Sequence, residues 1–120
     1  MSNSEKNGKG KVGYSSFPFP HKISVISSKG YQAIIRSARI GETEWYYQIE
    51  PCIYVCGKLW KERSDIMSCH VNNEEEAIVK ACMTLKSWLL YIASPYDVEW
   101  FINAVNAKIS ELTETSLFKT

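Results

Sequence analysis

Residues 72–92 read NNEEEAIVKACMTLKSWLLYI, and within them the hydrophobic pattern changes from alternating to helical. The two asparagines supply side-chain acceptors for a helix start, and three glutamates follow at the positive end of the helix dipole. Asn73 and Glu76 have the spacing of a capping box. Beyond them, apolar side chains recur at helical intervals at Ile78, Ala81, Cys82, Leu85, Trp88, Leu89 and Ile92. The stretch therefore predicts an amphipathic helix that begins at the glutamates.

A second helix is expected directly after the first. Ser94 can cap its start, Pro95 suits the first helical position, and Asp97 complements the dipole. A second apolar stripe follows at Val98, Phe101, Ile102, Val105, Ile109 and Leu112. The pattern therefore predicts two consecutive amphipathic helices.

Residues 21–71 instead show the period-two alternation of β-strands. Strands are expected around Ile23 and Val25, over residues 31–40, over residues 44–55 with an interruption at Pro51, and near residues 65–71. Short turns separate these runs, and short turns can join only antiparallel neighbours. We therefore expect an α+β fold, in which an antiparallel sheet of three to five strands is followed by two C-terminal helices packed on one face.

The domain organisation follows from the composition of the first residues. Residues 1–16 are rich in Gly, Lys, Ser and Asn and cannot bury enough apolar surface to offset their ordering entropy. They are expected to form a flexible N-terminal tail, and residues 17–120 are expected to form a single α+β domain. A chain of 120 residues is too short for two cores of normal size.

Charge and cysteine content limit the function classes. The chain has 14 basic and 13 acidic residues, which excludes both a histone-like polycation and an acidic mimic of nucleic acid. No apolar run spans a bilayer, and the first residues lack the apolar stretch of a signal peptide, so a cytoplasmic location is expected. In a reducing compartment, four residues are expected to be free thiols, namely Cys52, Cys56, Cys69 and Cys82.

A structural zinc needs four ligands, the number that Cys52, Cys56, Cys69 and His70 could supply. Cys52 and Cys56 flank an expected strand, which would hold their Cα atoms about 13 Å apart. Cys69 and His70 are adjacent and would point to opposite faces of the sheet. No metal and no cofactor are therefore expected.

The sequence gives no better support for a catalytic site than for a metal site. A cysteine nucleophile needs a histidine within hydrogen-bond reach, and a dyad would require His21 to approach from another strand. The side chains of residues 74–76 fan out by about 100° per residue, so these glutamates cannot converge on one substrate atom. The glycines of residues 8–13 lack the preceding strand of a phosphate-binding loop. The chain is therefore not expected to be an enzyme.

A mixture of aromatic and basic residues on the sheet suits single-stranded nucleic acid, because rings stack on bases and cations hold phosphates. The candidate cations are Arg36, Arg39, Lys58, Lys61 and Arg63. Glutamates at positions 42, 44, 50 and 62 would repel phosphate. Binding of single-stranded nucleic acid is therefore the alternative function.

Three strands followed by the helix EEEAIVKACMTLKSWL resemble the second half of a double-stranded-RNA-binding domain. That family begins its terminal helix with lysines that grip the RNA backbone. Here the equivalent turn has three glutamates, which removes the function that the resemblance implies. In size and layout the chain is also similar to the small proteins by which bacteriophages inhibit or redirect host machinery, although no motif supports that similarity.

Recognition of another protein is the favoured function. Two helices cover about one face of a small sheet, and Trp, Tyr and Arg dominate binding hot spots. We expect the open face, or an uncovered edge strand, to bind a partner protein or a second copy of the chain. The candidate contacts are Tyr46, Gln48, Tyr54, Trp60, Lys61, Arg63 and Trp100, the last because it lies off the second apolar stripe. A regulatory or inhibitory accessory protein is the expected kind of module.

Overall fold

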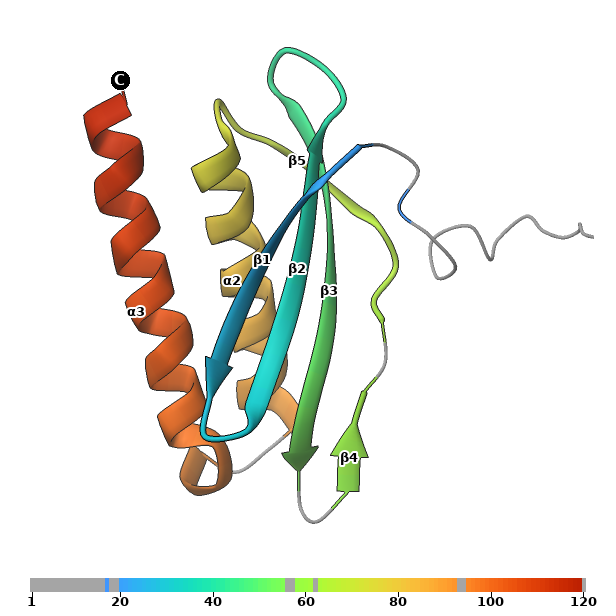
Figure 1. Cartoon of the computed structure of the whole chain (residues 1–120), viewed down its shortest axis with the longest axis vertical. Coiled ribbons are helices and arrows are strands. Elements are labelled where there is room, and N and C mark those ends of the chain that lie inside the picture. The colour runs from blue at the N-terminus through green and yellow to red at the C-terminus, as the bar shows by residue number, and fades with distance from the viewer. Residues whose placement is uncertain (1–16, 18–19, 56–57, 62, 93–94, 120) are drawn as a thin grey trace, which may run out of the picture.

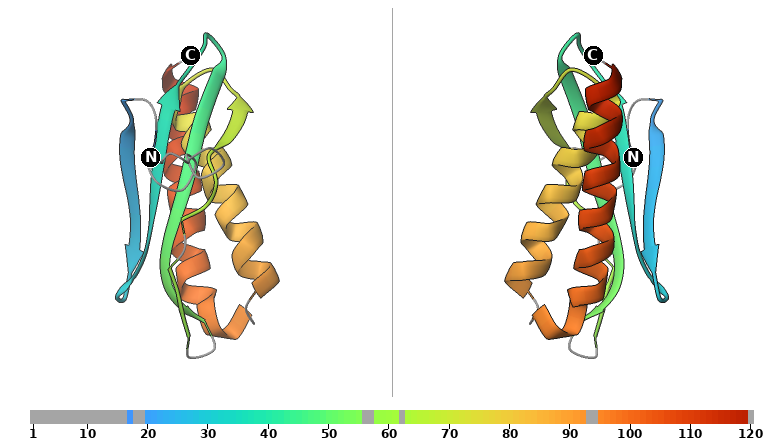
Figure 2. Two further views of the ribbon diagram at one scale, coloured as in Figure 1. Left: turned by 90° about the vertical axis from the view of Figure 1, so that its right-hand side faces the viewer. Right: turned by 90° about the vertical axis from the view of Figure 1, so that its left-hand side faces the viewer.

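The chain folds as an antiparallel sheet with two helices on one side of it, which confirms the predicted α+β class (Figures 1 and 2). The structure is a computed structural model that describes residues 17, 20–55, 58–61, 63–92 and 95–119. The predicted tail, residues 1–16, lies outside them. The elements in chain order are β1 (Lys22–Ser28), β2 (Tyr31–Arg39), β3 (Glu44–Val55), β4 (Lys58–Trp60), β5 (Met67–His70), α2 (Glu74–Ile92) and α3 (Pro95–Lys119).

The sheet has the order β1-β2-β3-β4, and β5 also pairs with β3. Both short strands lie along the same edge of β3, with β5 opposite residues 44–47 and β4 opposite residues 53–55. The outer edge of β3 is therefore shared by two strands that do not meet.

The turn between β1 and β2 is set by Lys29 and Gly30. Both have positive φ, 52° and 86°. Positive φ at both central residues is the requirement of a type I′ turn, whose twist matches that of a two-residue hairpin. Glycine at the second position meets this requirement without strain. The expected turn at residues 27–30 is thus a tight hairpin, and it fixes the register Ser28 opposite Tyr31.

Pro51 lies inside β3, opposite Ala33 of β2, rather than at a break. Two residues earlier, the N–H and C=O of Ile49 both bond to Ser64, so they point away from β2. Because backbone groups alternate in direction along a strand, the nitrogen of Pro51 also points away from β2. It faces the interval between β4 and β5, where the missing N–H costs no ladder hydrogen bond. This explains why the strand continues through the proline.

The start of α2 has the capping contacts that its sequence predicts. The N–H of Glu76 donates to Asn73 Oδ1 at 2.9 Å, and the N–H of Asn72 donates to Glu76 Oε1 at 2.9 Å. The two contacts satisfy two backbone donors at the helix entrance. The alternating pattern therefore ends where the predicted helix begins.

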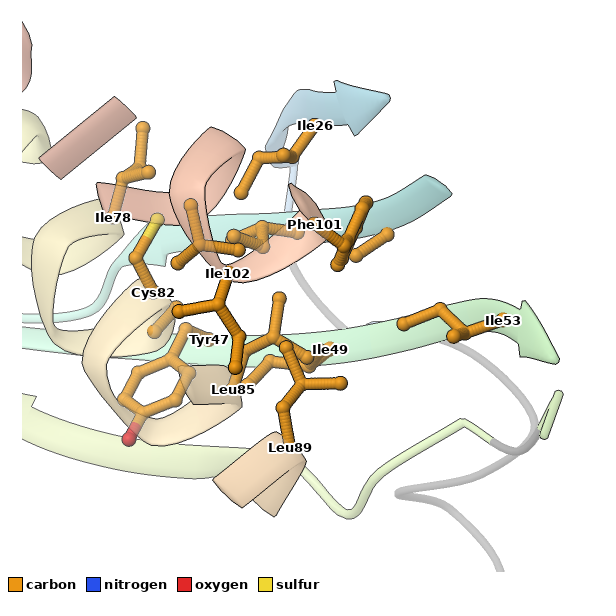
Figure 3. Packing of buried hydrophobic residues seen from close by; sticks show 14 of the residues in the cluster. Ile26, Tyr47, Ile49, Ile53, Ile78, Cys82, Leu85, Leu89, Phe101 and Ile102 are labelled. Atoms are coloured by element: carbon orange, nitrogen blue, oxygen red, sulfur yellow. The ribbon is translucent and has the colours of Figure 1, made fainter. Parts of the chain in front are cut away.

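The core lies between the sheet and the helices (Figure 3). Helix α2 packs on β2 and β3, and α3 packs on β1. The largest fully buried apolar side chains include Ile35 and Ile49 from the sheet and Leu85, Leu89 and Phe101 from the helices. Burying each such side chain stabilises the fold by roughly 1.5–3 kcal/mol. Neither helix in the described part of the chain is long and apolar enough to cross a membrane.

Candidate functional site

The two faces of the sheet differ in what covers them. In β3, Tyr47, Ile49 and Ile53 are buried beneath the helices, and the even-numbered residues alternate onto the opposite side. We call that opposite side, on which neither described helix lies, the open face (Figure 2). Its exposed apolar side chains include Ile23 and Val25 on β1. The open face is therefore the first surface to consider for recognition.

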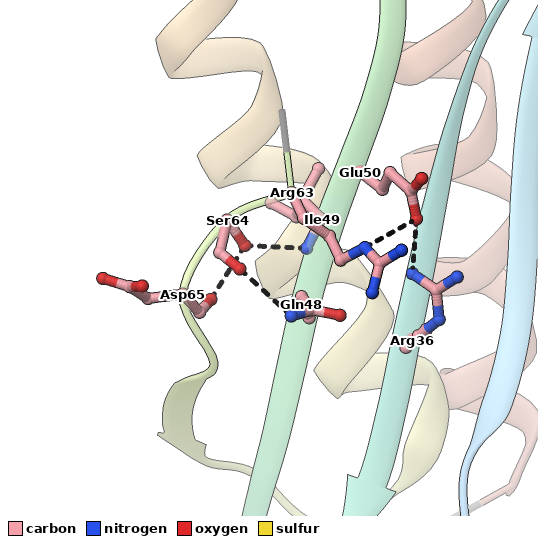
Figure 4. A network of polar contacts seen from close by, with 7 residues as sticks. All are labelled: Arg36, Gln48, Ile49, Glu50, Arg63, Ser64 and Asp65. Carbon is pink, nitrogen blue, oxygen red and sulfur yellow. Dashed lines mark hydrogen bonds and ion pairs between the residues drawn. The ribbon is translucent and has the colours of Figure 1, made fainter. Parts of the chain in front are cut away.

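The centre of the open face holds a network of polar contacts rather than aromatic rings (Figure 4). Glu50 on β3 accepts a hydrogen bond from Arg36 Nη1 at 2.8 Å, and its Oε1 lies 3.4 Å from Arg63 Nε. The side chains of Arg36 and Glu50 are only 18% and 20% exposed. A partly buried carboxylate shared by two guanidinium groups is a structural tie between β2, β3 and the segment after β4.

Ser64 attaches that same segment to the edge of β3. Its N–H donates to the Ile49 carbonyl at 2.8 Å, and its Oγ accepts from the Ile49 N–H at 2.9 Å. The Gln48 side-chain amide donates to the Ser64 carbonyl at 3.1 Å. Gln48 is fully buried as a result. The expectation that Gln48 offers its side chain to a partner is therefore wrong.

The five cations considered for nucleic acid do not gather on the open face. Arg36 and Arg63 share Glu50. Arg39 alternates onto the helix-facing side and donates to the carbonyls of Gly41 and Glu42, at 3.0 and 2.7 Å. Lys58 and Lys61 are exposed near the far end of the sheet, at β4. These positions do not form the continuous basic groove that tracks a phosphate backbone.

The aromatic candidates occupy different surfaces. Tyr54 lies on the open face and is 53% exposed, and Tyr46 is half-buried there. Trp60 pairs with Ile53 and so faces the helices, where its ring packs against Trp88. The register of β4 turns Leu59 outward onto the open face instead, and Trp60 stays a candidate contact on an edge strand.

Trp100 on α3 is half-buried beside the hairpin of β1 and β2. Its ring lies 4.4 Å from that of Tyr31, and the Lys29 ammonium is 5.8 Å from the ring centroid. Trp100 therefore packs between α3 and the hairpin, and its ring is only partly available to a partner. It does lie off the buried stripe of α3, as its sequence position predicts.

Strand β3 and helix α2 both end at the lower end of the molecule in Figure 1, and several large apolar or aromatic side chains near these ends are exposed. Tyr54 and its cross-strand neighbour Leu59 are 53% and 47% exposed, and Tyr91 in the last turn of α2 is 90% exposed. Trp60 on β4 and Trp88 on α2 contact each other, with ring centroids 6.3 Å apart. We call Tyr54, Leu59, Trp60, Trp88 and Tyr91 the aromatic end.

Three members of the aromatic end, Leu59, Trp88 and Tyr91, were not among the sequence candidates. Trp88 was assigned to the buried stripe of its helix, and Leu59 faces outward only because of the register of β4. Tyr91 lies off the stripe of its helix, as Trp100 does on the next one, so the same criterion would have found it.

The cysteines in the described part of the chain are poorly suited to nucleophilic catalysis. Cys52, Cys69 and Cys82 are free, and Cys56 lies outside the described residues. Burial raises the pKa of the Cys82 thiol to about 12, with a smaller opposing effect of Lys108. Burial also raises the pKa of Cys69, opposed by Lys80. Both groups are therefore poor nucleophiles at neutral pH. Across the described ranges, no three His, Cys, Asp or Glu side chains are grouped so as to hold a metal ion.

Comparisons with protein-family models, with curated proteins and with solved structures find no match to this chain.

Proposed function

We propose that the protein is a non-enzymatic module that recognises another protein through its aromatic end. The observation that supports the proposal is that Tyr54, Leu59 and Tyr91 are all exposed, at the end of the molecule where Trp60 of β4 contacts Trp88 of α2. Tyr and Trp are the side chains that contribute most to binding hot spots, because they bury a large area at a small cost in entropy. Exposed apolar side chains that cluster in this way mark interaction sites.

The surroundings of the aromatic end favour a particular partner chemistry. Lys58 and Lys61 are exposed on either side of the outward-facing Leu59. We therefore propose a partner surface with an apolar centre and acidic residues at its rim, because such charges would speed and orient association. A regulatory or inhibitory role toward that partner, in the cytoplasm where free thiols persist, belongs to the same proposal.

Affinity capture with matched variants tests this function. Tyr54→Ser combined with Tyr91→Ser removes two exposed rings of the aromatic end. Ile23→Ser combined with Val25→Ser removes two exposed side chains of β1 and is the control. The wild-type chain and the control variant should retain the same protein from a lysate of the source organism, and the aromatic-end variant should lose it. Retention of that protein by all three would contradict the proposal.

Light scattering on the same three proteins tests whether the partner is a second copy of the chain. A dimer that depends on concentration and disappears in the aromatic-end variant would identify a second copy as the partner. A dimer that disappears only in the β1 variant would contradict the proposal, because it would place recognition at the edge strand.

A further inference from the structure

A recess lies at the end of the molecule opposite the aromatic end, between the sheet and the start of α2. It has a volume of about 420 Å³, and Lys22, Ser37, Arg39, Trp45 and Glu74 are among the residues that line it. Lys22 is the cross-strand partner of Ser37, and Arg39 is that of Trp45. All four sheet residues alternate onto the helix-facing side, so their side chains share the space beside the first turn of α2.

Two buried hydrogen-bond donors in this recess have no partner. Ser37 is 2% exposed and Trp45 is 9% exposed. Within the described residues, neither the Ser37 hydroxyl nor the Trp45 Nε1–H has a hydrogen-bond partner. Buried polar groups are almost always bonded, and an unbonded one needs an explanation. Two such donors lining one recess indicate a ligand that brings acceptor atoms.

The charges of the recess indicate the class of that ligand. Lys22 and Arg39 are cationic, and Glu74 is the one carboxylate among the lining residues, so one positive charge is in excess. Lys22 Nζ lies 3.6 Å from Glu74 Oε2, an atom with no hydrogen-bond partner in the described chain. A ligand with one negative charge would balance the excess. A dianion would exceed that positive charge and would be repelled by Glu74.

The remaining lining favours an organic ligand over an inorganic ion. Pro20 and the ring of Trp45 supply apolar surface beside the donors. We propose that the recess binds the carboxylate of a small organic acid. Ser37 O–H and Trp45 Nε1–H donate to the carboxylate oxygens, and Lys22 and Arg39 supply the balancing charge. The side chain of Lys22 is 68% exposed and moves aside to admit the acid. This site is separate from the aromatic end.

Nuclear magnetic resonance of the indole N–H groups tests the site on the full chain. The four tryptophans give four indole signals, and Trp45→Phe identifies the one from Trp45. Titration with sodium benzoate should shift the Trp45 indole signal until the site is saturated, because a new acceptor polarises the N–H bond. Benzamide, which has the same shape without the charge, should produce no saturable shift. Inorganic phosphate should bind more weakly than benzoate.

Matched variants assign the effect to the recess. Ser37→Ala should raise the dissociation constant for benzoate by about tenfold, the usual effect of losing one hydrogen bond to a charged group. Ser27→Ala, an exposed serine of β1, should leave the constant unchanged. Lys22→Gln should weaken binding, and Lys58→Gln, at the far end of the sheet, should not. Lys22 is mostly exposed, so Lys22→Gln tests the site even if Ser37→Ala disturbs the fold.

Several results would overturn the proposal. One is an indole signal of Trp45 that benzoate does not shift to saturation. Another is binding of benzamide or phosphate as tight as that of benzoate. A third is wild-type affinity for benzoate in both Ser37→Ala and Lys22→Gln.

Discussion

The indole ring of Trp60 on β4 meets that of Trp88 on α2 edge to face, with centroids 6.3 Å apart and planes at 66°. This geometry places the positive edge of one ring against the negative face of the other. The contact joins a strand of three residues to the helix layer. We therefore regard it as the support of the aromatic end.

The Trp60–Trp88 contact should appear as an energetic coupling. In a double-mutant cycle with Trp60→Ala and Trp88→Ala, the two losses of unfolding free energy should differ from additivity by about 1 kcal/mol. Urea unfolding of the four proteins measures this coupling. A cycle between Trp60→Ala and Ile23→Ala is the control and should be additive. Additivity in the tryptophan cycle would show that the rings do not stabilise one another.

A buried leucine and an exposed leucine of α2 should respond differently to replacement by alanine. Leu85 is fully buried and Leu90 is 51% exposed. Leu85→Ala should lower the unfolding free energy by about 2–5 kcal/mol, because it leaves a cavity against the sheet. Leu90→Ala should change it by less than about 0.5 kcal/mol. Equal effects in urea unfolding would mean that α2 presents a different face to the sheet.

Ser64 should hold the segment after β4 on the edge of β3. Ser64→Ala removes the Oγ acceptor of the Ile49 N–H and should lower the unfolding free energy by about 1–2 kcal/mol. The Ile49 amide should then exchange its hydrogen faster. Ser68→Ala, at an exposed position of β5, is the control and should leave that amide protected. Unchanged protection of Ile49 in Ser64→Ala would contradict the contact.

The Cys82 thiol should make stability depend on alkaline pH. Burial raises its pKa to about 12 from 9.0, so above pH 9 the unfolded chain loses a proton that the folded chain keeps. The contribution is complete below pH 9 and is lost as the pH rises toward 12, with a slope of at most about 1.4 kcal/mol per pH unit. Cys82→Ala should therefore show a shallower decline of unfolding free energy above pH 9. Identical declines in the two proteins would contradict the raised pKa.

Single-stranded nucleic acid should bind weakly or not at all. Arg36 and Arg63 already share the carboxylate of Glu50, and Arg39 lies on the other side of the sheet. Fluorescence titration with an oligonucleotide at low salt measures the affinity where phosphate contacts are strongest. Tight binding that weakens with salt, and weakens further in Lys58→Gln and Lys61→Gln, would favour nucleic acid as the partner.

Local patterns were sufficient to predict most of the fold. The start of α2 depends on contacts within five residues, Asn72 to Glu76, and the hairpin at Lys29 and Gly30 depends on two residues with positive φ. The alternation of apolar and polar residues along β2 and β3 predicts which face of each strand is buried. Such signals are readable because the residues that create them are neighbours in sequence.

The proposed recognition surface depends on contacts between residues that are distant in sequence, and the sequence predicts it less well. Gln48 is buried because Ser64, 16 residues later, bonds to it, and nothing near Gln48 indicates this. Trp60 faces the helices because β4 pairs with the end of β3 in one register, and a shift of one residue would reverse it. The candidates Tyr54 and Trp100, far apart in sequence, both lie beside Tyr31 of β2, with ring centroids 6.3 and 4.4 Å from its ring.

Calorimetric titration of the captured partner tests the central claim most directly. If the aromatic end is the binding surface, Tyr54→Ser combined with Tyr91→Ser should raise the dissociation constant by roughly 100-fold or more, the usual loss of two hot-spot rings. Ile23→Ser combined with Val25→Ser should change it by less than about twofold. Equal dissociation constants for the wild-type chain and the aromatic-end variant would show that the partner binds elsewhere.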